Sequence, residues 1–336
     1  MKGRGAGLRS GGILAALLLI GLALPGGLSP YSQYLGVTIL AYAVLAQAWN
    51  LVGGYSGQFS LGVSAFVGVG GYATGLFMLH LGMGWLLASL AGTIFSGAFA
   101  FVLGFPLLRL RGPYFAVGTL AAAVALESGA QLWTWAGGGN GFVLPINELP
   151  SSETLFRLAV VAFVLAMAVI LFVEHSAFGL RLMAVRDDDH AAAGVGISGF
   201  WHKVAAFSVS GALTGLAGAL VAMQTVTVNP SSSFDLNWTT NAALFVVAGG
   251  IATTVGPLLG VVVVYVVLTQ QLQNLQALSV LIEGGLLVFI VRFAPRGLWP
   301  LIRQAFRAAV RRVARRGTAV STVSTVSTRP TITTPE

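Results

Sequence analysis

Charged side chains gather in one stretch of an otherwise apolar chain, residues 174–203 (EHSAFGLRLMAVRDDDHAAAGVGISGFWHK). The stretch holds four of the ten acidic residues, Glu174 and Asp187–Asp189, together with basic residues such as Arg186. Carboxylates are favoured at a helix start by the helix dipole, and the alanines that follow propagate a helix well. We therefore expect this stretch to contact a soluble partner in water. An ordinary solvated loop is the alternative interpretation.

Amides and hydroxyls interrupt a second stretch, Ala48–Gly71 (AWNLVGGYSGQFSLGVSAFVGVGG), which lies between apolar segments. Asn50, Gln58 and Ser60 stand there among several glycines. An amide inside a bilayer needs a hydrogen-bonding partner, and glycine lets the backbone depart from a regular helix. We expect a broken helix whose polar side chains line a pathway. Close helix packing by the glycines is the alternative.

Further polar residues fall within or beside apolar segments. Glu127 and Glu283 lie inside such segments, where carboxylates are expensive and usually face a bundle interior or a cavity. Asn140 lies in the Gly-rich stretch Trp133–Ser152. We expect Glu127 and Asn140 to line the same pathway as the three residues above. A position at the membrane surface is the alternative for both carboxylates.

The sequence contains no catalytic or cofactor-binding pattern. It lacks the G-x-x-x-x-G-K-[ST] of a P-loop and the G-x-S-x-G of a nucleophile elbow, and it has no cysteine. The four histidines form no compact metal-binding pattern; they are His80, His175, His190 and His202. The sequence therefore predicts a protein that is not an enzyme and that itself binds neither a metal nor ATP.

The composition indicates a membrane protein. Of its 336 residues, 56% are hydrophobic and 8% charged, and the mean hydropathy is +0.86. A soluble domain carries about 25% charged residues, so this chain has too little polar surface for a soluble globule. Nine of the 18 basic residues fall at or after Arg292. That distribution matches a cytoplasmic flank of membrane helices and argues against a nucleic-acid partner.

The elements that must position the polar residues are apolar segments of helical length. The first, Gly11–Leu24, is short for a span of about 20 residues. We expect a retained helix there, with a cleaved signal peptide as the alternative. Further apolar segments follow at 33–52, 60–80, 84–107, 113–132, 155–173 and 203–223, then two short pieces at 241–252 and 256–269, and a last one at 278–293.

Basic residues orient these segments, because cytoplasmic flanks collect Lys and Arg. With the N-terminus inside, loops 109–111 and 174–203 fall inside, whereas loops 133–153 and 224–240 fall outside. Only Arg157 then lies on the wrong side. The C-terminal basic cluster also belongs inside, so both termini are predicted to be cytoplasmic.

With both termini inside, the number of crossings is even. It is ten if both short pieces within 241–269 cross and eight if they form a re-entrant pair, and both stay open. The interrupting glycines and proline indicate a broken or re-entrant pair, whose backbone survives where protein or a water-filled cavity surrounds it. The predicted fold is all-α, a polytopic membrane helix bundle of eight to ten transmembrane segments with broken or re-entrant helices. This transmembrane domain covers 1–316, and the Ser-Thr-Val-rich tail at 317–336 is predicted to be disordered.

Several stretches of the chain resemble the permeases of bacterial branched-chain amino acid ABC importers, specifically the M-type subunit of the Liv system. Each stretch alone is a weak signal, but together they follow the family's order over roughly residues 40–300 and are specific for it. They are Ala48–Gly71 (with AWNLVGGYSGQFSLG), Leu108–Leu120 (LRLRGPYFAVGTL), Gly137–Phe142 (GGGNGF), Gly179–Ile197 (GLRLMAVRDDDHAAAGVGI) and Phe293–Trp299 (FAPRGLW).

The resemblance implies a permease subunit in the bacterial inner membrane that carries branched-chain or related amino acids. The implied partners are a second, H-type permease subunit, two cytoplasmic ATPase subunits that use the ATP, and a periplasmic or extracellular solute-binding protein. Asp187–Gly194 matches the family's ATPase-docking loop. The residues that the resemblance assigns to ATPase coupling are Arg186, Asp187, Asp188, Asp189, Ala192 and Gly194.

The chain departs from the family's pattern in three places. Pro113 stands where many relatives carry Asp, Gly137–Gly139 lacks a common Thr, and the alanines after His190 lack a carboxylate that often follows them. These departures bear on the solute, since related permeases carry urea, short amides, other amino acids, sugars or nucleosides. Two other classes stay open: an ion-coupled secondary transporter or channel for a small polar solute, driven through Glu127 or Glu283, and a membrane scaffold.

Overall fold

The fold is almost entirely helical, as the sequence predicts. The computed structural model describes residues 3–269, 285 and 297–299. Its α-helices are α1 (Gly3–Ala23), α2 (Pro30–Trp49), α3 (Val63–Leu81), α4 (Trp85–Leu107), α5 (Pro113–Leu132), α6 (Ser152–His175), α7 (Ala177–Asp187), α8 (Asp189–Gly194), α9 (Gly199–Thr225), α10 (Pro230–Ser233), α11 (Leu236–Gly249) and α12 (Gly256–Gly260). Two π-helical segments, η2 (Asn50–Tyr55) and η6 (Val261–Thr269), continue α2 and α12, and two short strands, β1 (Phe142–Val143) and β2 (Thr227–Val228), pair with each other. Short 3-10 turns complete the described part: η1 (Leu24–Gly27), η3 (Thr134–Ala136), η4 (Gly138–Asn140) and η5 (Ile146–Glu148).

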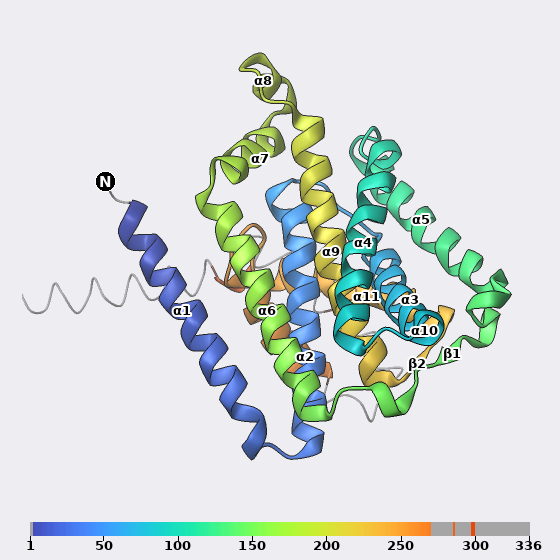
Figure 1. Cartoon of the computed structure of the whole chain (residues 1–336). Coiled ribbons are helices and arrows are strands. Elements are labelled where there is room, and N and C mark those ends of the chain that lie inside the picture. Colours follow the sequence, from blue (N-terminus) through green and yellow to red (C-terminus); the bar gives the residue numbers. More distant parts are fainter. Residues whose placement is uncertain (1–2, 270–284, 286–296, 300–336) are drawn as a thin grey trace, which may run out of the picture.

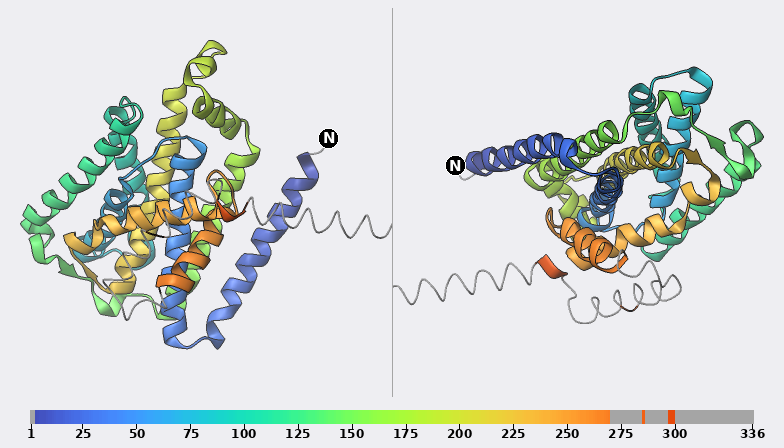
Figure 2. Two further views of the ribbon diagram at one scale, coloured as in Figure 1. Left: turned by 180° about the vertical axis from the view of Figure 1, so that it is seen from behind. Right: turned by 90° about the horizontal axis from the view of Figure 1, so that it is seen from below.

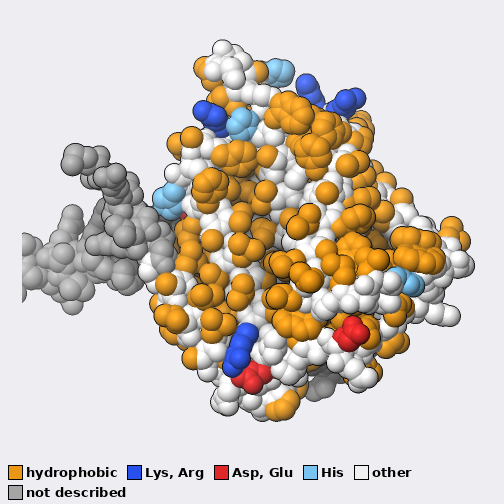
Figure 3. Space-filling model, viewed as in Figure 1, with side chains coloured by type: hydrophobic (Ala, Val, Ile, Leu, Met, Phe, Trp, Pro, Cys, Tyr) orange, Lys and Arg blue, Asp and Glu red, His pale blue; other side chains and the backbone are white. Residues whose placement is uncertain are grey.

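Within the described residues, six helices are long and apolar enough to cross a membrane: α2 with η2, α3, α4, α5, α6 and α9. Figure 3 shows the Lys, Arg, Asp and Glu side chains of one face gathered toward its upper and lower ends, with an apolar band between them. The chain is therefore a multi-pass membrane protein. Helix α1 packs on α6, where Gly21 lies against Val160. The predicted segment 278–293 (apart from residue 285), the C-terminal basic cluster and the tail 317–336 lie outside the described residues, so the total of eight to ten crossings stays a prediction.

Helices α2, α3 and α9 form the centre of the bundle. Their apolar windows are 67–78% buried, against 22–28% for α4 and α5. Glycines permit this packing: a methyl group at Gly70 of α3 would lie 2.3 Å from the Cα of Gly215 in α9, and one at Gly218 would lie 2.2 Å from the carbonyl oxygen of Val67. Such distances exclude a side chain. These glycines therefore let the helices pack closely, as the alternative interpretation of Ala48–Gly71 requires.

The molecule has two chemically different ends (Figures 1 and 2). Helices α7 and α8, η2 and the turn from α4 to α5 lie at one, which we call the α8 end. The turn from α1 to α2 and the β1–β2 ribbon lie at the opposite one, which we call the ribbon end. Arg157 lies at the ribbon end and forms an i,i+4 ion pair with Glu153. The basic residues of the α8 end are Arg109, Arg111, Arg181, Arg186 and Lys203.

Helix α11 and the α12–η6 segment form an antiparallel hairpin beside α2 (Figure 2). Near the turn, a methyl group at Gly249 would lie 1.7 Å from the carbonyl oxygen of Gly256. Away from the turn, the ring of Tyr42 in α2 contacts the rings of Trp238 and Tyr265, one on each arm of the hairpin. The two arms therefore run side by side in opposite directions.

The first arm of the hairpin is short for a membrane crossing. Helix α11 contains 14 residues, or about 21 Å at 1.5 Å per residue, which is less than the hydrocarbon core of about 30 Å. The broken pair predicted for 241–269 is therefore present. We call residues 250–255 the hairpin tip. This segment has no regular helix; Thr254 is buried in the protein, whereas Ile251 and Val255 are exposed. Irregular backbone at membrane depth is tolerated where it is buried in protein or lines a water-filled cavity.

Tight turns hold the Gly-rich loop at the ribbon end. Gly137 and Gly141 have φ angles of 83° and 71°, a left-handed conformation that favours glycine. A methyl group at Gly141 would lie 2.0 Å from the carbonyl oxygen of Val228. The next residue, Phe142, pairs with Val228 in the β1–β2 ribbon. The glycines thus tie the loop after α5 to the end of α9.

Candidate functional site

A polar groove of about 580 Å³ opens at the α8 end. Three stretches that are far apart in the sequence line it: residues 56–58 after η2, residues 108–112 between α4 and α5, and residues 185–190 across α7 and α8. Arg109 and Arg111 therefore share one cavity with the acidic cluster of α7–α8. A groove with both signs of charge at the end of a membrane protein is suited to a polar protein surface, because complementary charges set orientation and register.

The carboxylate of Asp188 caps α8. Its Oδ1 accepts hydrogen bonds from the backbone N–H of His190 at 2.9 Å and of Ala191 at 3.0 Å. The bond from Ala191 is the largest cause of a pKa for Asp188 below its ordinary value, and the bond from His190 adds to the effect. The helix start predicted at this acidic cluster is confirmed.

The other two carboxylates form ion pairs that fix the loop. Asp187 Oδ1 lies 2.9 Å from Arg186 Nη2, and Asp189 Oδ2 lies 3.0 Å from Lys203 Nζ in α9. Figure 1 shows α8 protruding beyond the rest of the bundle. Of the remaining predicted coupling residues, Ala192 is buried and Gly194, the last residue of α8, is exposed.

Helix α7 is docked on the π-helical end of α2. Arg186 Nη1 donates a hydrogen bond to the carbonyl oxygen of Gly54 at 3.1 Å. The side chain of Arg186 also covers Gly57, where φ is 71° and an added methyl group would lie 2.3 Å from Arg186 Cγ. One turn earlier on α7, Leu182 is fully buried in a cluster with Leu51 and Tyr55 of α2–η2. One hydrogen bond from a charged side chain and one apolar contact thus join the two elements.

Two buried amides of α2–η2 hold the hairpin tip. Asn50 Nδ2 donates to the carbonyl oxygen of Thr253, and Asn50 Oδ1 accepts from the backbone N–H of Ala252, both at 2.9 Å. Gln47 Nε2 donates to the carbonyl oxygen of Thr254 at 2.7 Å. Both amide side chains have no solvent exposure. Three backbone groups of the tip are therefore satisfied by side chains of α2 and η2, as buried polar groups require.

The tip is held in a strained conformation. Ala252 has a φ of 56°, and a left-handed conformation costs a residue other than glycine about 1–2 kcal/mol. The hydroxyl of Thr254 bonds to the carboxylate of Glu174 in the last turn of α6, and the hydroxyl of Thr253 accepts from the backbone N–H of Gly256 at 3.1 Å. Strain of this kind persists where surrounding contacts fix the backbone, and it clusters at switch regions.

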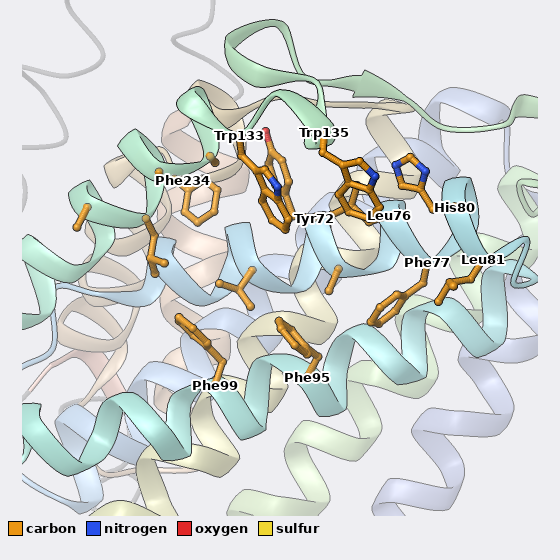
Figure 4. Close-up of a pocket in the computed structure, with 16 residues that line it drawn as sticks. Tyr72, Leu76, Phe77, His80, Leu81, Phe95, Phe99, Trp133, Trp135 and Phe234 are labelled. Carbon is orange, nitrogen blue, oxygen red and sulfur yellow. The ribbon is translucent and has the colours of Figure 1, made fainter.

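A second cavity, of about 570 Å³, lies toward the ribbon end between α3, α4 and α5. Its lining is apolar and aromatic (Figure 4). His80 at the end of α3 stacks on Trp135 with ring centroids 4.1 Å apart, and Trp135 contacts Trp133. Tyr72 lines the cavity with its hydroxyl buried and without a hydrogen-bond partner among the described residues.

The predicted pathway residues do not meet at one place. Asn50, Gln58 and Ser60 lie toward the α8 end: Asn50 holds the hairpin tip, Gln58 lines the polar groove, and the carbonyl oxygen of Ser60 accepts from Trp49 Nε1 at 2.9 Å. Ala48–Gly71 does contain the predicted break, because η2 and the residues after it separate α2 from α3.

The remaining pathway candidates lie elsewhere. Glu127 is on α5, where its Oε1 accepts from Gln131 Nε2 at 3.4 Å, and Asn140 is exposed in η4 at the ribbon end. Glu283 lies outside the described residues. Among the residues that the structure describes, no group of three or more His, Cys, Asp or Glu is placed to hold a metal ion.

Sequence reasoning misses two contributors to the α8 end. Gln47 is a second buried amide, three residues before Asn50, and that helical spacing inside an apolar segment is a signal for a shared buried partner. In the sequence, Arg109 and Arg111 predict only which side of the membrane their loop faces. The structure places both in the polar groove. No sequence signal pairs them with residues 185–190, because the groove is formed by the fold.

Comparisons with known proteins agree with this architecture. The family described as "Branched-chain amino acid transport system / permease component" matches residues 32–291. The high-affinity branched-chain amino acid transport system permease protein LivM of Salmonella typhimurium is 31% identical over 86% of this chain and 75% of its own length. LivM of Escherichia coli is 29% identical over the same shares.

A more distant relative and the solved structures complete the comparison. The probable branched-chain amino acid transport permease protein LivM of Methanocaldococcus jannaschii is 26% identical over 77% of this chain and 90% of its own length. No solved structure matches the chain significantly. The family match covers most of the helical bundle, including η2, the polar groove and the hairpin. The chain belongs to the branched-chain amino acid transport system permease family.

Proposed function

We propose that this chain is the membrane-spanning permease subunit of an ATP-binding-cassette importer that translocates branched-chain or related amino acids. The observation that carries the proposal is the protruding α7–α8 loop and its mixed-charge groove in a chain of this family of transport permeases. The relatives are named as branched-chain amino acid permeases. The described fold supplies helices to cross the membrane and an exposed polar element for a soluble partner.

The proposed complex contains a second, H-type permease subunit, two cytoplasmic ATPase subunits and a periplasmic or extracellular solute-binding protein. The ATPases bind and hydrolyse ATP, and this chain binds no cofactor. The α8 end faces the cytoplasm, because it carries most of the basic residues of the described part. The chain then lies in the bacterial inner membrane with both termini cytoplasmic.

The proposed ATPase-docking surface is composite. Its protruding part is α7–α8, with the residues predicted from the resemblance. Its other wall is the α4–α5 turn with Arg109 and Arg111. An ATPase surface seated there contacts acidic and basic groups together, which fixes its orientation more strongly than one sign of charge alone. The proposed coupling residues of α7–α8 act in two ways. Asp187, Asp188, Asp189 and Gly194 belong to the surface that contacts the ATPase, whereas Arg186, which donates to Gly54, and the buried Ala192 position the loop.

The proposed pathway residues belong to two levels of the membrane. Asn50, Gln58 and Ser60 act at the cytoplasmic level, where the α2 break and the hairpin tip meet. Glu127 and Asn140 act at the outer level, on α5 and the Gly-rich loop. This division suits a carrier that opens alternately to the two sides, since each level then has its own polar residues.

Charge neutralisation of the acidic cluster tests the proposal. Changing Asp187, Asp188 and Asp189 together to Asn removes three charges but retains the N-cap of α8, because Asn caps a helix as well as Asp does. Loss of a buried partner in a charge pair at an interface costs about 2–5 kcal/mol. The triple variant should therefore insert normally, yet retain much less ATPase on co-purification and show reduced ATP-driven uptake in vesicles.

The matched control is Glu148→Gln, which removes a charge at the ribbon end. It should keep wild-type ATPase association and uptake. The ordinary-loop interpretation predicts wild-type association and uptake for the triple variant as well, and that result would contradict the proposed docking role of α7–α8.

A further inference from the structure

Helix α7 is mechanically connected to the hairpin tip through the end of α2. Arg186 of α7 donates to the carbonyl oxygen of Gly54 at 3.1 Å. The Cα of Gly54 in turn faces the tip, because an added methyl group would lie 2.2 Å from Asn50 Oδ1 and 2.8 Å from the backbone nitrogen of Ala252. Asn50 completes the connection with its two hydrogen bonds to the tip.

The intermediate element is suited to a change of shape. Residues Asn50–Tyr55 continue α2 as a π-helix rather than as an α-helix, and such turns occur frequently at functional sites. The close approaches at Gly54 and Gly57 leave no room for side chains. A displacement of α7 toward η2 therefore has to move η2, and a displacement away from it has to break the contact between Arg186 and Gly54.

The two ends of this connection differ in exposure. The side chain of Arg186 is 31% exposed at the polar groove, whereas Asn50 has no exposure. The tip carries the strained Ala252, whose φ is 56°. The conformation of the tip is therefore fixed by its contacts rather than by the backbone preference of its residues. When one of these contacts is released, the tip is the element that we expect to change conformation.

We propose that Arg186 is a positioning residue that couples α7–α8 to the hairpin tip through Gly54 and Asn50. Movement of α7 in a partner ATPase shifts η2, and η2 shifts the tip of the re-entrant hairpin. The tip is the element that changes access at the cytoplasmic level of the pathway. This coupling step rests on the proposed function, whereas the connection within the chain does not.

Hydrogen exchange tests the connection in the isolated chain. Arg186→Ala removes a hydrogen bond from a charged group, and such bonds are stronger than those between neutral groups. The backbone amides of 250–256 should therefore exchange about tenfold faster or more, a change that corresponds to about 1.4 kcal/mol or more. Gly57→Ala displaces Arg186 without removing its charge and should have the same direction of effect.

The matched control is Arg181→Ala, which removes an exposed arginine from the same helix outside the polar groove. It should leave exchange at 250–256 unchanged. Size-exclusion chromatography of each variant checks that the bundle is intact. Unchanged exchange at 250–256 in a folded Arg186→Ala or Gly57→Ala protein overturns the connection.

A distance measurement tests the coupling in the complex. Because the chain has no cysteine, spin labels can be placed through Val143→Cys at the ribbon end and Val255→Cys at the tip, both exposed positions. With the partner ATPase bound, ATP should change the distance between the two labels in the parent and in Arg181→Ala. In Arg186→Ala the ATPase should still co-purify while the ATP-dependent change is lost.

Each outcome of this measurement bears on one claim. An ATP-dependent change of parental size in Arg186→Ala overturns the coupling role. Loss of ATPase association in Arg186→Ala alone makes Arg186 a docking contact and also overturns it. Absence of ATPase association in every variant, the parent included, contradicts the proposed function, and hydrogen exchange then still decides whether the connection exists.

Discussion

At the scale of the residue, the carboxylate of Asp188 makes the stability of helix α8 depend on pH. Its folded-state pKa lies below the ordinary value because Ala191 and His190 donate backbone hydrogen bonds to it. A lowered carboxyl pKa contributes stability that is present above the ordinary pKa and is lost as pH falls through the folded pKa. The protection of the α8 amides, which is their exchange rate relative to an unstructured chain at the same pH, should therefore be constant near neutral pH and fall in acid. Asp188→Asn keeps the cap but does not titrate, so a similar acid-dependent loss of protection in that variant would contradict the assignment to Asp188.

The buried hydroxyl of Tyr72 lowers the stability of the fold. It is buried without a hydrogen-bond partner among the described residues, and an unsatisfied buried group costs about 1–3 kcal/mol. Tyr72→Phe should therefore leave thermal stability in detergent unchanged or raise it. The control is Ser96→Ala, which removes a buried hydroxyl that donates to Gly211 at 2.9 Å and should lower stability by about 1 kcal/mol. A clear loss of stability in Tyr72→Phe would show that the hydroxyl has a partner.

At the scale of the element, a substitution by glycine should be tolerated at the hairpin tip but should destabilise helix α11. Ala252 has a left-handed backbone, so Ala252→Gly removes strain that offsets the usual entropic cost of glycine. Ala242→Gly, in the buried interior of α11, lacks that compensation and should destabilise by about 1 kcal/mol. Thermal unfolding of the two variants checks the contrast, and equal destabilisation would mean that the tip is not strained.

The sequence predicts the existence of these elements but not how they meet. The glycines and amides of Ala48–Gly71 indicate the break at η2, and the short pieces within 241–269 indicate the hairpin. In contrast, Arg186 and Gly54 are 132 residues apart, and Asn50 and Thr253 are 203 residues apart. Contacts of this kind follow from helix packing, for which the sequence has no local signal. The candidate site was therefore predicted as a list of residues, and only the fold divides that list between the two ends.

At the scale of the whole molecule, the asymmetry of basic residues predicts which end faces the cytoplasm. A cysteine introduced by Val143→Cys at the ribbon end should react with a membrane-impermeant thiol reagent in intact cells. One introduced by Asp188→Cys at α8 should react only after the membrane is permeabilised. The chain has no cysteine of its own, so the background is low. Labelling of the Asp188 position from outside would overturn the orientation and the docking proposal together.

The energy source separates the proposed importer from an ion-coupled transporter or channel, the class that Glu127 and Glu283 leave open. An importer needs its ATPase and binding protein, whereas a secondary transporter responds to an ion gradient through its own carboxylates.

The most direct test is uptake of radiolabelled leucine into vesicles that contain this chain with its partner permease and ATPases. The vesicles hold ATP inside and receive the binding protein outside. The proposed function predicts uptake that requires ATP and the binding protein, persists when ion gradients are collapsed, and falls in the Asp187, Asp188 and Asp189 to Asn variant. Uptake that is driven by an ion gradient without ATP would contradict it.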